Sequence, residues 1–256
     1  MNDELVQERR GSVLVLRLNR PDARNALTPG LLAGIGAALL AAESDPEVRS
    51  IVLTATGDRA FCAGMDLRAF AGGTDMGGAG EHTAAYQRLT RGETRLPVIG
   101  AANGAAIGGG LELLLGCDVI VASGSARFGF PEVRRGLFPA GGGTFVGTRI
   151  PLAVALEMVL TGDLIDAARA QQLGLVNTVV APDEVLATAL AIAERIGANA
   201  PLGLAAAKEL VRLGVADTAR ATARMAEWQS TVFTSEDAKE GAMAFVEKRK
   251  PVWKGR

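Results

Sequence analysis

The sequence has few of the residues that usually carry covalent or metal chemistry. It contains one histidine, His82, and two cysteines, Cys62 and Cys117, among 256 residues. Both cysteines lie within apolar stretches, which argues against a disulfide framework and against a zinc site, so we expect buried reduced thiols and no bound metal. A single histidine beside a glycine-rich segment gives little support to Ser-His-Asp or Cys-His catalysis, and we interpret His82 as a solvated residue.

The sequence also lacks excess charge of one sign and long apolar runs. Lys and Arg number 27 against 28 Asp and Glu, a formal net charge of -1 without a basic block, which disfavours binding to nucleic acids or membrane surfaces. No stretch reaches the roughly 18 to 20 apolar residues that would span a bilayer, and the acidic start lacks the apolar segment of a signal peptide. We therefore expect a cytoplasmic protein whose partners are small molecules or copies of itself.

Hydrophobic residues are abundant, at 48%, and their pattern predicts an α/β fold. Expected strands at 12–18, 50–54, 98–102 and 119–122 alternate with helices at 29–44 and 109–116, which indicates a parallel or mixed sheet covered by helices. Segment 72–80 holds five glycines and is interpreted as a mobile loop, a candidate lid. After Pro182 four amphipathic helices are expected, at 185–196, 201–213, 216–233 and 235–249. The sequence thus predicts a body over 1–198 and a helical region over 199–256, which either forms a subunit interface or covers the body's own core.

The most informative motif is Gly108-Gly109-Gly110-Leu111-Glu112. Glycines in a first helical turn leave backbone N–H groups open to a ligand oxygen, and the helix dipole favours negative charge there. Glu112 lies three residues after Gly109 on the same face, and helical side chains lean toward the helix N-terminus. The motif therefore predicts an anion-binding backbone with an acid or base beside it, although a glycine-rich turn before an ordinary helix would look the same.

Three further segments carry possible site residues. Phe61 to Leu67 is a loop that turns at Gly64 and enters a helix, so its N–H groups could form a second donor. Phe128 to Glu132 places another carboxylate just after a strand, twenty positions beyond Glu112. Ala140 to Thr144 offers one more glycine-rich helix entry.

Together these segments resemble the crotonase, or enoyl-CoA hydratase/isomerase, superfamily along essentially the whole chain. The matching pieces are Asn19-Arg20-Pro21, Asn25-Ala26-Leu27, Phe61 to Leu67, Asn103-Gly104, Gly108 to Glu112, Cys117-Asp118, Phe128 to Glu132, Leu160-Thr161-Gly162, Gly174 to Asn177, and the tail from Glu240-Gly241 to Arg249. The resemblance implies a repeated ββα spiral core with a C-terminal helical trimerisation region, and a homotrimer or dimer of trimers. It also implies an acyl-CoA thioester substrate, so that coenzyme A belongs to the substrate and no separate cofactor is needed.

The resemblance also implies roles for individual residues. The backbone N–H groups of Met65 and Gly109 would hold the thioester oxygen, where negative charge develops. Glu112 would activate water and Glu132 would donate a proton, while the backbone of Ala140, at a position where hydratases have glycine, would help to place the water. Residues expected to contact coenzyme A are Arg24, Ala63, Asp66, Leu67 and Arg68, with Phe245 and Lys248 reaching the site of a neighbouring subunit.

Retention of both glutamates favours hydration of a 2-enoyl-CoA, because isomerases of this superfamily generally keep only one. A double-bond isomerase and a dehydratase of the carnitinyl-CoA type stay open, the latter because the tail from Glu247 to Arg256 resembles such enzymes. Some relatives bind RNA, which the balanced charge disfavours here.

Overall fold

The computed structural model describes residues 4–73 and 78–256, and within them the strands form two sheets. The larger sheet has the order β1-β2-β3-β5-β7-β10, with β1 antiparallel to β2 and all other neighbours parallel. Its strands are β1 (Leu5–Arg10), β2 (Val13–Leu18), β3 (Ser50–Ala55), β5 (Val98–Ala102), β7 (Val119–Ser123) and β10 (Thr178–Val180). The smaller sheet, β4 (Ala60–Cys62), β6 (Ala105–Ile107), β8 (Arg127–Gly129) and β9 (Ile165–Asp166), is parallel except for the β8–β9 pair.

Successive strand pairs divide between the two sheets. In β3–β4, β5–β6 and β7–β8 the first strand joins the larger sheet and the second joins the smaller one. Helices follow each pair: α2 (Leu67–Ala71) and α3 (Glu81–Arg91), then α4 (Gly109–Gly116), then α5 (Leu152–Thr161) and α6 (Ala167–Gln172). This ββα spiral confirms the predicted fold class. Sequence reasoning missed β1, β4, β6, β9 and β10, and the last four, of two or three residues each, are too short to show an alternating pattern.

Helices bury both faces of the larger sheet, and every residue of β3 is buried. On one face lies α1 (Pro29–Ser44), which starts where Thr28 accepts a hydrogen bond from the backbone N–H of Leu31 at 3.0 Å. On the other face α7 (Val185–Gly197) packs Val185, Ala189 and Ala193 against the valines of β2. Buried on both sides, these strands read as continuous apolar runs in the sequence, as is typical of parallel sheets.

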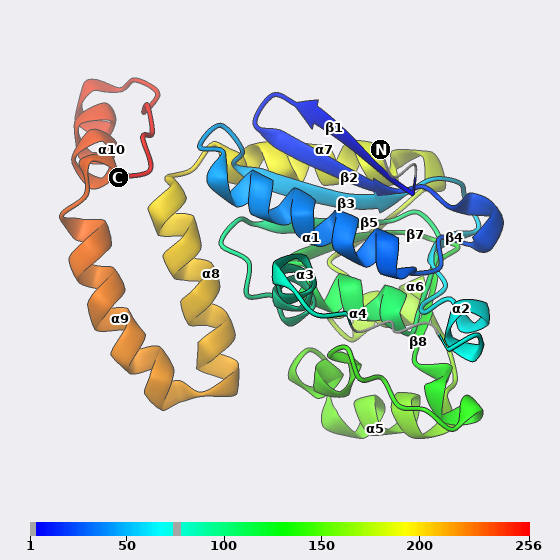
Figure 1. Ribbon diagram of the computed structural model, residues 1–256. Coiled ribbons are helices and arrows are strands. Elements are labelled where there is room, and N and C mark those ends of the chain that lie inside the picture. The colour runs from blue at the N-terminus through cyan, green and yellow to red at the C-terminus, as the bar shows by residue number, and fades with distance from the viewer. Residues whose placement is uncertain (1–3, 74–77) are drawn as a thin grey trace.

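The last three helices form an arm that stands away from the body (Figure 1). The arm, residues 201–256, contains α8 (Pro201–Ala216), α9 (Thr218–Phe233) and α10 (Glu236–Glu247). Helices α8 and α9 are joined by Glu209, which accepts hydrogen bonds from Arg224 at 2.6 Å and Trp228 at 2.9 Å. The boundary expected at 198/199 falls between α7 and α8, and the arm as a separate unit stays a prediction.

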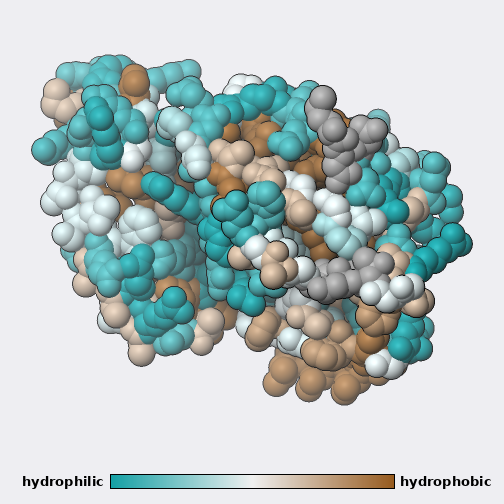
Figure 2. All heavy atoms as spheres, viewed as in Figure 1, coloured by the Kyte–Doolittle hydropathy of each residue, from teal (hydrophilic) through white to brown (hydrophobic). Residues whose placement is uncertain are grey.

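Large apolar side chains are exposed on two surfaces. The first, which we call the α5 face, comprises the exposed large apolar side chains of the segment 131–164, namely Val133, Phe138, Phe145, Leu152, Leu156, Leu160 and Leu164. Helix α5 lies at the bottom of Figure 1, where Figure 2 shows an apolar area. Leu152, Leu156 and Leu160 follow one another at intervals of four and so form one stripe of α5. The second surface is on the arm and contains Val211, Val215, Met225, Phe233, Met243, Phe245 and Val246.

Two further observations concern the described residues only. Within 4–73 and 78–256, no helix combines the length and apolar character needed to cross a bilayer. In the same residues, no group of three or more His, Cys, Asp or Glu side chains could hold a metal ion. The lid predicted at 72–80 includes 74–77, which lie outside the described residues, so it stays a prediction.

Candidate active site

Three parallel strands of the smaller sheet deliver the candidate residues. Strands β4, β6 and β8 are neighbours, and their carboxyl ends lie at the same edge of the sheet. The loop with Met65 follows β4, the glycine run with Gly109 follows β6, and Glu132 follows β8. Ligand sites of α/β proteins form at such edges, which explains how segments up to 70 positions apart meet.

The loop after β4 packs directly on the start of α4. Gly64 has a φ of +90°, and a Cβ placed there would lie 2.8 Å from the Ile107 carbonyl oxygen and 3.3 Å from the Gly109 nitrogen. Only glycine fits such a contact. Met65 follows Gly64, so its backbone comes next to the first turn of α4, where the Gly109 N–H has no acceptor within the helix.

A short parallel bridge orients the Met65 peptide. The Leu27 N–H donates to Gly64 O at 2.8 Å and the Asp66 N–H donates to Leu27 O at 3.0 Å. Since successive peptide N–H groups of an extended chain point to opposite sides, the Met65 N–H points away from Leu27. It is therefore free of the bridge, as the predicted role in binding a substrate oxygen requires.

Asn25 holds the turn that carries Leu27. It adopts a left-handed conformation with φ 54°, its Oδ1 accepts from the Arg20 N–H at 2.8 Å, and its Nδ2 donates to Thr56 O and Ala60 O. Arg20 adds a hydrogen bond to Ala26 O at 2.6 Å and an ion pair with Asp66. Sequence reasoning matched these residues to a family motif but did not assign this supporting role to them.

Glu112 is buried on α4, with 7% of its surface exposed, and its carboxylate is held in place. Its Oε1 accepts hydrogen bonds from the backbone N–H groups of Gly141 at 2.8 Å and Gly143 at 3.0 Å. Burial raises the pKa of Glu112, and the hydrogen bonds from Gly143 and Gly141 oppose that rise by stabilising the charged form. Glu112 is thus a fixed carboxylate with a raised proton affinity, suited to accept a proton.

Glu132 lies in the 3-10 segment Pro131–Arg135, and its carboxyl group is next to Gly108. Its Oε2 is one of two buried polar side-chain atoms without a hydrogen bond among the described residues, the other being Asn103 Oδ1. Burial raises the pKa of Glu132, its own backbone N–H lowers it, the charge of Glu112 raises it further, and Arg135 lowers it. An unpartnered oxygen with a raised pKa favours the protonated form, which can donate a proton.

The two carboxylates flank the first turn of α4. A Cβ placed on Gly108 would lie 2.6 Å from Glu132 Oε1, and one placed on Gly109 would lie 3.7 Å from Glu112 Oε2. The structure therefore brings together both glutamates, Gly109 and the Met65 loop, as the sequence predicted. Sequence reasoning did not identify the donors to Glu112 as Gly141 and Gly143. The water-placing role expected for the neighbouring Ala140 stays a prediction.

Helix α4 has no free space on two of its sides. Side chains at Gly110 and Gly116 would overlap the carbonyl groups of Cys62 and Leu89.

Tyr86, one turn before Leu89 and Thr90 on α3, interacts electrostatically with Cys62 and Glu112, and burial raises its pKa. Tyr86 therefore lies at the edge of the site, although sequence reasoning did not single it out.

Of the residues expected to contact coenzyme A, some are exposed and others already have partners within the chain. Arg24, Leu67 and Arg68 are exposed, and Ala63 is half-buried with its N–H donating to Arg24 O at 3.0 Å. Asp66 is already occupied: it caps α2 through the N–H groups of Arg68 and Ala69 and pairs with Arg20 at 3.2 Å. Its carboxylate holds the loop, and a direct contact between Asp66 and coenzyme A stays a prediction.

Phe245 and Lys248 lie on the arm and face solvent in the single chain. Phe245 is 86% exposed near the end of α10, and Lys248 follows that helix in a left-handed conformation. This exposure is what a role in a neighbouring subunit's site requires, but their contact with coenzyme A stays a prediction.

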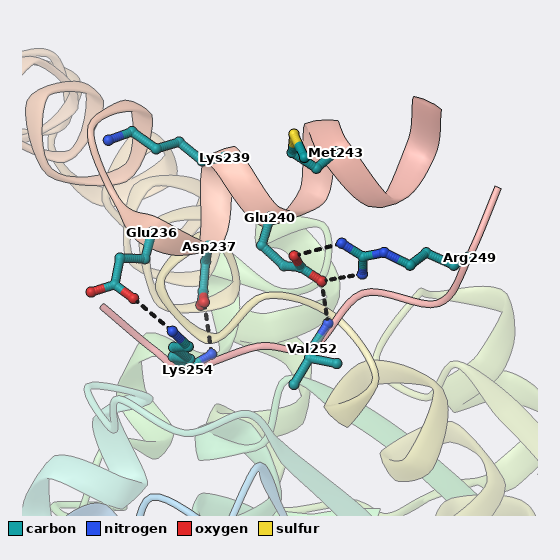
Figure 3. A pocket seen from close by; sticks show the side chains of 8 residues that line it. All are labelled: Glu236, Asp237, Lys239, Glu240, Met243, Arg249, Val252 and Lys254. Carbon is teal, nitrogen blue, oxygen red and sulfur yellow. Dashed lines mark hydrogen bonds and ion pairs between the residues drawn. The ribbon is translucent and has the colours of Figure 1, made fainter. Parts of the chain in front are cut away.

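A hollow of about 520 Å³ lies between α10 and the C-terminal segment, away from Glu112 and Glu132 (Figure 3). Most of its charged side chains are paired with one another or with the backbone. Glu240 binds Arg249 and the Val252 N–H, Asp237 accepts from the Lys254 N–H at 2.7 Å, and Glu236 pairs with Lys254. These contacts hold the C-terminal segment against α10, so we assign the hollow a structural role.

Comparison with known proteins agrees with this geometry. The sequence profile of the enoyl-CoA hydratase/isomerase family matches residues 8–256. A probable enoyl-CoA hydratase from Rhizobium meliloti (strain 1021) is 40% identical over 266 aligned positions, which cover 99% of each chain. A carnitinyl-CoA dehydratase from Proteus mirabilis (strain HI4320) is 38% identical over 267 aligned positions, which cover both chains completely.

Solved structures give the same result. The crystal structure of an enoyl-CoA hydratase from Mycobacterium tuberculosis H37Rv superposes with a TM-score of 0.91 at 40% identity, and that of a carnitinyl-CoA hydratase from Mycobacterium avium with 0.78 at 44%. Both matches cover 100% of this chain and of the solved chain. The family match spans the glycine run, both glutamates and the Met65 loop, and this chain belongs to the enoyl-CoA hydratase/isomerase family.

Proposed function

We propose that the protein is an enoyl-CoA hydratase, which adds water reversibly and in the syn sense to a trans-2-enoyl-CoA and forms a 3-hydroxyacyl-CoA. The observation that carries the proposal is the convergence of Glu112 and Glu132 on the Gly108–Gly109 turn, beside the Met65 loop. Two carboxyl groups at one donor site suit a reaction that removes one proton and delivers another. We propose that this activity serves fatty acid β-oxidation in the cytoplasm. The two cysteines are buried and free, which agrees with a reducing compartment.

In the proposed mechanism the thioester oxygen accepts hydrogen bonds from the N–H groups of Met65 and Gly109. Attack at C3 moves the π electrons toward the carbonyl and leaves an enolate with its negative charge on that oxygen. Preorganised donors stabilise such a charge by about 3 to 4 kcal/mol each when measured by removal. The N-terminus of α4 adds its dipole to the same atom.

The glutamates handle the protons. Glu112 accepts a proton from the attacking water as the C3–O bond forms, and Glu132 donates its proton to C2 as the enolate collapses. The environments support this division, since two N–H donors stabilise the carboxylate of Glu112 while Glu132 Oε2 lacks a partner. The charge of Glu112 raises the pKa of Glu132, so Glu132 keeps its proton more tightly while Glu112 is ionised.

We propose that coenzyme A lies along the surface formed by Arg24, Ala63, Leu67 and Arg68, with Asp66 fixing that loop. The exposed guanidinium groups of Arg24 and Arg68 suit phosphate binding. Phe245 and Lys248 would contact the coenzyme A bound to a neighbouring subunit.

We further propose that the chain forms a homotrimer or a dimer of trimers through the arm. The segment around α5 and the arm each expose several large apolar side chains, and extensive exposed apolar surface often marks an interaction site. Two different apolar surfaces on one chain can pair head to tail, and such contacts close into rings.

The test is hydration of a series of trans-2-enoyl-CoA esters of increasing length, followed by loss of the conjugated thioester's ultraviolet absorbance. We expect turnover with at least one member and formation of the 3-hydroxyacyl product. Absence of turnover with every member, by protein shown to be folded, would exclude the hydratase assignment.

A second candidate is a dehydratase of the carnitinyl-CoA type. Its support is the carnitinyl-CoA dehydratase of Proteus mirabilis, which matches this chain from end to end. Turnover of carnitinyl-CoA at a rate well above that of simple 3-hydroxyacyl esters would favour this candidate. A double-bond isomerase is a weaker alternative, and migration of a 3-enoyl double bond without water uptake would identify it.

A further inference from the structure

The arm is attached to the body by a group of charged side chains, which we call the Asp118 cluster. It consists of Asp118, which precedes β7, Arg149 of the body, and Lys208 and Arg212 of α8. Lys208 Nζ lies 2.8 Å from Asp118 Oδ2 and also donates to Thr94 Oγ1 at 2.7 Å and Leu96 O at 2.8 Å. Arg212 approaches the other carboxylate oxygen, Oδ1, through Nε at 3.2 Å and Nη2 at 2.9 Å.

The Asp118 cluster also caps the carboxyl end of α4, the helix that carries Gly109 and Glu112. Arg212 Nη2 donates to the carbonyl oxygens of Gly116 at 3.1 Å and Cys117 at 3.0 Å, and Arg149 Nη2 donates to Cys117 O at 3.2 Å. Gly116 is the last residue of α4 and Cys117 its C-cap. Carbonyl groups at a helix C-terminus lack intrahelical partners and carry partial negative charge, so these cations satisfy them.

The opposite end of α4 carries the proposed chemistry. The helix has eight residues, about 12 Å in length, so Gly109 and Glu112 lie one to two turns from the cap. Gly110 and Gly116 pack against backbone carbonyls, so a helix of about two turns has no room there to bend between its ends. A displacement of its carboxyl end is therefore passed to the N–H group and the carboxylate at its amino end.

We do not expect the main role of the Asp118 cluster to be stabilisation of the fold. The Lys208 side chain is 8% exposed, and the Asp118 carboxylate pairs with Lys208 and Arg212, while Arg149 binds the neighbouring Cys117 carbonyl. Removing such charges from water has a cost that the attraction between them barely offsets. What the cluster does provide is a fixed geometry between α8 and α4.

We propose that Arg212 and Lys208 are positioning residues for the reaction, through which the arm sets the placement of α4 and so of the Gly109 N–H and Glu112. This inference rests on the proposed enolate chemistry. It assigns to the arm a second task besides assembly: the arm holds the catalytic helix in register with the Met65 loop.

The test uses the full-length protein and acetoacetyl-CoA, whose bound enolate has its own near-ultraviolet absorbance. Variants R212Q, R212K and K208M are compared with R224Q, which breaks the Arg224–Glu209 ion pair inside the arm and leaves the cluster intact. We expect R212Q to lower the enolate fraction about tenfold and the hydration kcat about ten- to a hundredfold, with KM changed less than about threefold. R212K, which keeps the charge but loses the planar fork, should show a smaller loss in the same direction. R224Q should match the wild type.

A wild-type enolate fraction in R212K and K208M, together with kcat within about twofold, would overturn the proposal even if R212Q fails to fold. Loss of thermal stability alone, without a change in the enolate signal below the melting temperature, would likewise reduce the cluster to a structural role. If the wild type hydrates no enoyl-CoA, the proposed function fails, while the enolate measurement still decides this proposal.

Discussion

At the residue scale, the two glutamates differ in how their charged forms are stabilised. Glu112 receives two backbone hydrogen bonds, whereas Glu132 Oε2 is buried without a partner. Two residues of the same type, twenty positions apart, thus both have a raised pKa but differ in the contacts that oppose the rise. The sequence supplies both residue types, but their proximity is implied only by the family resemblance, because β6, the strand before α4, does not show in the sequence pattern.

Replacing either carboxyl group by an amide removes its proton transfer. We expect E112Q and E132Q each to lower the hydration kcat by about 10²- to 10⁴-fold with little change in KM. The exposed Glu157 on α5 provides the control, since E157Q should leave the rate unchanged. A steady-state assay that gave E112Q or E132Q a rate within tenfold of the wild type would contradict the assigned roles.

The pH dependence of activity follows from the same pair. Burial raises the pKa of both carboxyl groups, so activity should fall on the acid side as Glu112 binds a proton and on the alkaline side as Glu132 loses one. Initial rates at saturating substrate should give a bell-shaped profile for kcat. The residual activity of E132Q should lack the alkaline limb, and its persistence would show that another group donates the proton.

Burial of Glu132 also affects stability. Because its pKa is raised in the folded state, the folded protein binds this proton more tightly than the unfolded chain. The stabilisation is complete below the unfolded pKa and is lost as the pH rises through the folded pKa, so above the folded pKa the ionised group destabilises the fold. We expect E132Q to be more stable than the wild type by about 1 kcal/mol at pH 7, about 2 to 4 °C in melting temperature, with the difference shrinking at lower pH. Thermal unfolding at several pH values measures it, and a less stable E132Q at neutral pH would refute it.

At the element scale, glycines allow backbone segments to meet around α4. Gly64 admits the Ile107 carbonyl and Gly141 admits the Glu112 carboxylate. The sequence indicated the glycine-rich entries but could not show what each one contacts, because a glycine's partner depends on the tertiary structure. Family likeness indicates Ala140 as the residue that places the water. The structure instead shows that the glycines after it, Gly141 and Gly143, donate to Glu112.

Gly141 offers a direct test of this packing. A Cβ at this position would lie 2.5 Å from Glu112 Oε2, so G141A should displace the catalytic carboxylate and lower kcat at least tenfold without unfolding the protein. Gly214 in α8 has nothing within 4 Å of the corresponding position, and G214A serves as the matched control. Equal kcat values for G141A and G214A would show that the position of Glu112 does not depend on this loop.

At the scale of the whole molecule, hydrophobic periodicity predicted four strands of the larger sheet, β2, β3, β5 and β7, and all four late helices. It could not predict the second sheet, since β4, β6 and β8 are three residues each and their burial depends on distant strands. The outward position of the arm was likewise beyond sequence reasoning, because its amphipathic helices fit equally well on their own body or on a neighbour.

The exposed apolar stripe of α5 predicts how assembly should respond to charge. L156D places a carboxylate in the middle of the α5 face and should shift the protein from its assembled form to monomer. V6D, on the exposed side of the edge strand β1, is the control with a similar change of residue. Molar mass by light scattering at several concentrations distinguishes the two, and an unchanged mass for L156D would exclude this face from the interface.

The close packing of α4 also has a consequence for divergence within the family. A helix whose glycines touch backbone carbonyls on two sides cannot shift to admit a bulkier substrate without losing its fit to β4 and α3. We therefore expect new substrate ranges to arise by changes in the segments around it, such as α2, α3 and the turn after β8, with α4 itself kept. Relatives that act on different thioesters are thus expected to share this helix and its glycine spacing and to differ in the walls that surround it.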